Sequence, residues 1–176
     1  MKTLYKFLRT GLKSDSGKHT WEIGKWYKED KIDICNSGFH ASKTPLQAMR
    51  YVGGEILAKV SVRGKSIIED DKECWSEMKI IKAWHWTKKD SVELAIFSAE
   101  LCLSNFEKVY PDDKRPRLAI KAAKEWLKNP NKENESAAKA AEAAKAAKAA
   151  WSAKAAEKIN QWFIKKIKSL QIYDKI

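Results

Sequence analysis

The sequence has no apolar stretch long enough to cross a membrane, which takes about 18 consecutive apolar residues. Its longest candidate, residues 92–103, carries Glu93 and Glu100. The first residues also lack the apolar core of a signal peptide, because Lys6 and Arg9 interrupt it. These absences argue against a membrane protein, and they predict a cytoplasmic protein with no membrane partner.

Cysteine is scarce, and the three cysteines, Cys35, Cys74 and Cys102, lie far apart. An odd number of dispersed cysteines is typical of reduced, mostly buried thiols and not of a disulfide framework. No Cys-x-x-Cys pair occurs, and only three histidines could complete a ligand set. We therefore expect no metal site, and no motif requires a cofactor.

Glycine is absent after Gly64, since all seven glycines fall between Gly11 and that residue. Glycine supplies the positive φ angles of tight turns, so a turn-rich β region should precede an uninterrupted helical one. The sequence predicts an α+β protein: a small mixed or antiparallel β-rich head with a short helix over residues 1–88, then an all-α helical bundle over 89–176.

Within the head, several local patterns predict elements. Thr44 can cap a short helix whose first residue is Pro45. Apolar residues alternate over 56–62, the period of a half-buried strand, and Arg63-Gly64-Lys65 reads as the turn after it. Further strands are expected over residues 4–8 and 78–86.

Three helices are expected in the second region, over about 90–108, 116–128 and 136–170. Thr87-x-x-Asp90 is typical of a helix start, and Pro116 can open the next helix. From Ala137 two alanines alternate with one larger residue, which favours a long alanine-rich helix. We interpret that helix as a packing rod, because it continues into an apolar stripe of Ile159, Trp162, Phe163, Ile167 and Leu170. A solvent-exposed spacer, a dimer face and a membrane-surface face are the alternatives.

Positive charge is concentrated in the second region. The net charge is +12, and the 16 basic and 8 acidic residues from Tyr110 onward account for +8 of it. Such a field attracts nucleic acid or a protein with an acidic face. The candidate binding residues are basic side chains of this region: Arg115, Arg117, Lys139, Lys145, Lys148 and Lys154.

Two segments resemble known families. The first resembles an N-terminal domain of unknown function that is common in phage and prophage genes. It consists of Cys35-x-x-Gly38-Phe39-His40-Ala41-Ser42, then Pro45, Ala48, Tyr51 and the strand 56–62. The second resembles the immunity proteins of bacterial toxin systems. It consists of Asp90-Ser91-Val92-Glu93-Leu94-Ala95, Arg115-Pro116-Arg117-x-Ala119-Ile120-x-Ala122-Ala123 and the alanine triplets. The second resemblance implies a cytosolic antagonist that neutralises another protein.

Catalytic signatures are absent: the sequence has no P-loop, dinucleotide fingerprint, His-Glu-x-x-His or Gly-x-Ser-x-Gly. His40 is the one outside candidate, because its surroundings resemble part of an ADP-ribosyltransferase-like core. A later glutamate, Glu69, Glu73 or Glu77, would then stabilise the transition state, although no spacing selects one of them. The interpretation we prefer is structural, with His40 and Ser42 completing a strand end and a helix cap. A Cys35–His40 nucleophile pair is disfavoured, because no orienting third group is evident.

We therefore expect a non-enzymatic antagonist similar to immunity or phage anti-defence (anti-CRISPR-like) proteins. Its partner would be a protein effector, namely a toxin, nuclease or ribonucleoprotein. A basic protein that binds nucleic acid and blocks an effector's access to DNA or RNA is the alternative, and an ADP-ribosyltransferase-like enzyme is the second alternative. The sequence leaves the oligomeric state open between monomer and homodimer.

Overall fold

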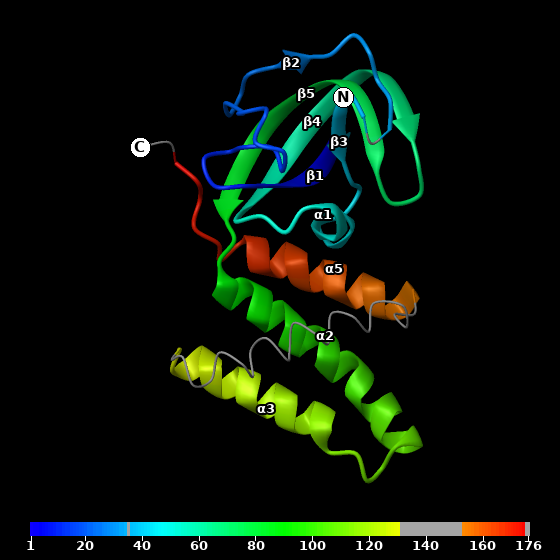
Figure 1. The fold of residues 1–176 in the computed structure, drawn as a ribbon, viewed down its shortest axis with the longest axis vertical. Helices are drawn as coiled ribbons and strands as arrows, with labels where there is room; N and C mark the ends of the chain where they lie inside the picture. The colour runs from blue at the N-terminus through cyan, green and yellow to red at the C-terminus, as the bar shows by residue number, and fades with distance from the viewer. Residues whose placement is uncertain (35, 131–152, 175–176) are drawn as a thin grey trace. The chain divides into compact units, whose positions relative to one another are not determined.

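The computed structural model describes residues 1–34, 36–130 and 153–174 (Figure 1). The chain forms two compact units, one made of Met1–Trp86 with Trp162–Ile176 and the other of Thr87–Gln161. The alanine triplets, with Lys139, Lys145 and Lys148, lie outside the described residues, as does Cys35.

An antiparallel sheet is the body of the first unit. Its strands are β1 (Lys2–Leu8), β2 (Tyr27–Lys28), β3 (Phe39–Ala41), β4 (Ile56–Ile68) and β5 (Glu73–His85). The order is β1-β4-β5-β2, and β3 also pairs with β5. The predicted α+β class with an antiparallel β-rich head is confirmed.

Hydrogen bonds close this sheet on itself. Beyond the end of β3, the Ser42 amide donates to the Tyr5 carbonyl at 2.9 Å, and the Tyr5 amide donates to the Ser42 carbonyl at 2.8 Å. Strands β1, β4, β5 and β3 are therefore consecutive neighbours in a closed circuit. This closure places the middle of β1 next to β3.

The core of the first unit follows from strand alternation. Leu4, Val60 and Ile80 stand opposite one another on three neighbouring strands and are at most 1% exposed. Leu12 and Trp21, from the long connection after β1, pack against the same cluster. Period-two alternation therefore identified this buried face correctly. The prediction of a half-buried strand is wrong, however, because Leu57 and Ser61 on the opposite face of β4 are buried as well.

The predicted turn at Arg63-Gly64-Lys65 is wrong. β4 continues through these residues to Ile68, and the pairing with β5 is irregular between Arg63 and Ser66. Gly64 adopts a φ of 84° there, and a Cβ at this position would lie 2.3 Å from the Ser76 hydroxyl. Glycine is needed at this bulge because of the positive φ and the close approach to Ser76, and pairing with β5 resumes at Ser66.

The predicted helix start at Thr44 is confirmed. α1 (Pro45–Tyr51) begins with a capping box, in which the Gln47 amide donates to the Thr44 hydroxyl and the Gln47 side chain accepts from the Thr44 amide. Thr44, and not Ser42, is thus the helix cap.

The end of the chain returns to the first unit. Trp86 stacks on Phe163 with ring centroids 5.2 Å apart, and Phe7 meets Trp86 edge to face at 5.7 Å. The His85 amide donates to the Gln171 carbonyl at 2.9 Å, so residues after the last helix extend the pairing of β5. Phe163 and Ile159 of the predicted apolar stripe are fully buried, as packing requires, whereas Trp162, Ile167 and Leu170 are half-buried.

Two helices make up most of the described part of the second unit. α2 (Lys88–Val109) begins with a capping box between Thr87 and Asp90, as predicted, and α3 (Arg115–Lys128) follows after a short connection. The helices lie side by side (Figure 1), and their apolar contact consists of Val92, Ala95, Ile96, Ile120, Ala123 and Trp126. The last helix, α5, spans Ala153–Ile167. No helix within the described ranges is both long and apolar enough to cross a membrane.

Candidate functional site

Basic side chains form a stripe along the outer side of α3. Arg117, Lys121, Lys124 and Lys128 are spaced four, three and four residues apart, which places them on one side of a helix. All four are exposed, whereas Ile120, Ala123 and Trp126 of the same helix are buried against α2. We call these four residues the α3 stripe.

Acidic neighbours hold part of this stripe in place. The Arg117 guanidinium donates to both carboxylate oxygens of Glu107, at 2.8 and 2.7 Å, and the Lys124 ammonium lies 2.6 Å from Glu100. The hydrogen bond from Arg117 lowers the pKa of Glu107. Lys121 has no ion pair with any residue that the structure describes, so its charge is available to a partner.

The binding residues predicted from the sequence are only partly brought together. Arg115 and Arg117 lie close in sequence at the start of α3, but the Arg115 guanidinium donates to Asp113 at 2.7 Å, and its hydrogen bonds lower the pKa of Asp113 to about 2. Lys154 is exposed at the beginning of α5. Lys121, Lys124 and Lys128 are not among the residues predicted from the sequence, although their helical spacing is a signal that identifies them.

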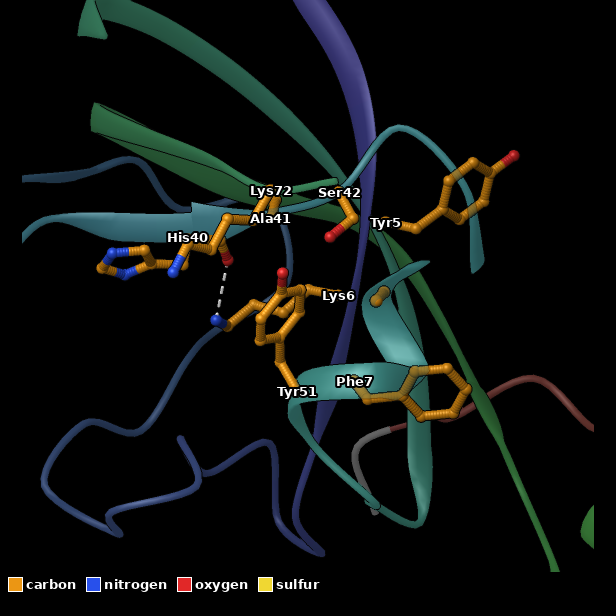
Figure 2. A pocket seen from close by; sticks show the side chains of 9 residues that line it. Tyr5, Lys6, Phe7, His40, Ala41, Ser42, Tyr51 and Lys72 are labelled. Atoms are coloured by element: carbon orange, nitrogen blue, oxygen red, sulfur yellow. Dashed lines mark hydrogen bonds between the residues drawn. The ribbon is translucent and has the colours of Figure 1, made fainter. Parts of the chain in front are cut away.

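A second candidate lies in the first unit, where a pocket of about 160 Å³ opens between β1, β3 and α1. We call it the Lys6 pocket, and Figure 2 shows its lining: Tyr5, Lys6, Phe7, His40, Ala41, Ser42, Ala48, Tyr51 and Lys72.

His40 contributes mainly its backbone to this pocket. Its carbonyl accepts a hydrogen bond from the Lys6 ammonium at 2.8 Å, while its ring points away from the other labelled side chains (Figure 2). Burial lowers the pKa of His40, and the positive charges of Lys6 and Lys72 lower it further. The imidazole is therefore neutral near pH 7.

The carboxylates proposed as partners of His40 have other contacts. Glu73 is fully buried, lies 2.5 Å from the Lys2 ammonium and accepts the Trp75 indole N–H at 2.9 Å. Glu77 pairs with Arg63 at 2.7 Å, and Glu69 lies 3.6 Å from Lys72. None of the three lines the Lys6 pocket. Across the described ranges, no cluster of three or more histidine, cysteine or acidic side chains could hold a metal ion.

Comparison with known families divides the chain at about the same place as the change from sheet to helices. Residues 2–89 match the model of the family described as Domain of unknown function (DUF7666). Residues 85–163 match the model described as Imm-5 like putative immunity protein. No curated protein and no solved structure matches the chain.

Proposed function

The chain belongs to the family of the Domain of unknown function (DUF7666), with an Imm-5 like region after that domain, and from this arrangement we propose a non-enzymatic cytoplasmic antagonist. The protein binds a toxin effector protein and neutralises it. The observation that carries the proposal is the immunity-family match over residues 85–163, which spans all of α2 and α3.

The described part of the second unit suits a binding role. The apolar contact between α2 and α3 contains no residue of the α3 stripe, although Arg117 and Lys124 also pair with Glu107 and Glu100 of α2. Arg117, Lys124 and Lys128 are held by ion pairs with glutamates, and Lys121 adds a charge outside these pairs. Such a row of basic side chains is complementary to an acidic protein face and accelerates the encounter with it through long-range attraction. Leu118, which is 61% exposed between the basic residues, supplies apolar area for the same contact.

In the anti-defence, anti-CRISPR-like form of this proposal, the effector is a nuclease or a ribonucleoprotein. Nucleic acid is the competing partner, because a basic helix also attracts phosphates.

The test reverses the charge of the α3 stripe in the complete chain. Lys121, Lys124 and Lys128 are changed together to Glu, and the matched control changes Lys31, Lys43 and Lys65, exposed lysines of the first unit, to Glu. Tagged proteins are used to capture partners from nuclease-treated lysate of the native host, and the amount of each captured protein is measured. The captured protein is then expressed in that host with and without each variant, and growth is followed.

We expect the unaltered chain and the control to retain a stoichiometric protein and to restore growth. The stripe variant should bind it at least about tenfold more weakly, because reversed charges repel an acidic face. Equal behaviour of the two variants would place the interface elsewhere. Capture that disappears after nuclease treatment, with binding to DNA that falls linearly in log salt, would replace the protein partner by nucleic acid.

A further inference from the structure

We propose that the Lys6 pocket is a binding site for a small organic carboxylate, with Lys6 as its charged anchor. The pocket lies in the first unit, outside the residues that match the immunity family, and would remain if the α3 stripe had no partner.

The charge of the lining is one-sided. Lys6 and Lys72 line the pocket, and no aspartate or glutamate does. The Lys6 ammonium donates to the His40 carbonyl at 2.8 Å, and no carboxylate of a described residue forms an ion pair with it. Asp15 attracts this ammonium only from a distance, without a direct ion pair. A partly buried ammonium with no carboxylate in contact is unfavourable, so an anion entering the pocket supplies a direct contact.

The charge count favours a monoanion. Lys72 is already 3.6 Å from Glu69, and its ammonium lies 5.4 Å from the centre of the Tyr51 ring. Lys6, which no carboxylate of a described residue contacts directly, is therefore the one lysine of the lining left to pair with a ligand, and a single ammonium matches a carboxylate better than a phosphate dianion.

The remaining walls select an apolar tail. Phe7, Ala41 and Ala48 are buried apolar residues, and the Tyr51 ring adds an aromatic side. The Tyr51 hydroxyl donates a hydrogen bond to Asp71. Burial, and to a smaller extent this hydrogen bond, raises the pKa of Tyr51 to about 12, so the phenol stays neutral. A volume of about 160 Å³ admits only a short acyl chain or a single small ring.

The pKa of Lys6 can report the binding of an anion directly. Burial lowers the pKa of Lys6 to about 8, although Asp15 and Cys74 oppose the shift. An appreciable fraction of this amine is neutral and reactive at pH 7.5. A bound carboxylate favours the ammonium and therefore raises the pKa of Lys6.

The experiment titrates the complete ¹⁵N-labelled chain with butyrate, using butyramide as an uncharged control of the same shape. We expect saturable amide shifts confined to residues 5–7, 40–42 and 48–51. Butyramide should bind at least about tenfold more weakly, the value of one charge-assisted contact. Saturating butyrate should slow acetylation of Lys6 at pH 8 and leave the exposed Lys65 unchanged.

Lys6→Met should abolish the amide shifts that butyrate causes. If that variant does not fold, the comparison of butyrate with butyramide in the unaltered chain tests the proposal. Equal binding of the two probes, or no saturable shift, overturns the proposal. Stronger binding of inorganic phosphate than of butyrate also overturns it. The carboxylate that binds in the cell comes either from a protein side chain or from a free small molecule. Glutamate blocked at both backbone ends distinguishes them, because binding comparable to that of butyrate indicates a side chain and failure to bind indicates a free small molecule.

Discussion

Gly53 and Gly54 are adjacent glycines between α1 and β4, but their surroundings differ. A Cβ on Gly54 would lie 2.1 Å from the carbonyl oxygen of Leu8, which is far inside the contact distance of a real side chain. A Cβ on Gly53 would meet nothing within 4 Å. The backbone of β1 thus passes so close to one glycine that no other residue fits there.

Gly54→Ala is expected to lower the free energy of unfolding by roughly 2 kcal/mol or more, since two backbone segments must move apart. Gly53→Ala, the matched control, should change it by less than about 1 kcal/mol. Urea unfolding of both variants measures the difference. Equal losses would show that the close approach to Leu8 is not what requires glycine.

Residue type alone was a poor guide to the Lys6 pocket. His40 is the outside catalytic candidate because its surroundings resemble part of an ADP-ribosyltransferase-like core, yet its ring points away from the other labelled side chains and its carbonyl accepts the Lys6 hydrogen bond. Lys6 was noted only as a charge that interrupts an apolar run. Its contact with His40 exists because Ser42 pairs with Tyr5, and nothing in the residues around Lys6 encodes that pairing.

Among elements, helix starts were the most predictable feature. The capping boxes at Thr44 and Thr87 are both present where the sequence places them, because every donor and acceptor of a cap lies within three residues. The length of β4 was not predictable in the same way. Gly64 is typical of a turn, and only the pairing of β5 with residues on both sides of Gly64 continues the strand past it.

The contact between α2 and α3 is expected to depend on Trp126, which is 7% exposed and packs in the cluster with Val92 and Ile96. Trp126→Ala should cost about 3 kcal/mol of unfolding free energy, the usual loss for a large core residue. Leu118→Ala on the same helix should cost less than about 0.5 kcal/mol, because Leu118 is 61% exposed. Chemical denaturation followed by circular dichroism compares them, and similar losses would contradict the described packing.

At the scale of the whole molecule, the first unit is assembled from both ends of the chain. Phe163 is fully buried and stacks on Trp86, and the Gln171 carbonyl accepts the His85 amide. Residues 162–173 therefore contribute to the stability of the sheet, although they follow the helical region in sequence.

A chain ending at Gln161 should accordingly unfold more easily in its first unit, and the His85 amide should exchange with solvent markedly faster. In the complete chain, Phe163→Ala should lower stability by roughly 3 kcal/mol. Ile164→Ala is the matched control, because Ile164 follows Phe163 in sequence but is 46% exposed. Unchanged exchange at His85 in the shortened chain would show that the return of the chain end does not stabilise β5.

The sequence by itself determined the α+β class, one buried face of β4 and the two capped helix starts. These features depend on residues two to four positions apart, whose relative placement the local backbone geometry dictates. Only the tertiary structure decided that β4 passes through Gly64, that Ser42 closes the sheet beside Lys6 and that the chain end joins β5. Each of these depends on contacts between distant segments, where packing and hydrogen bonding must outweigh the entropy lost on bringing them together.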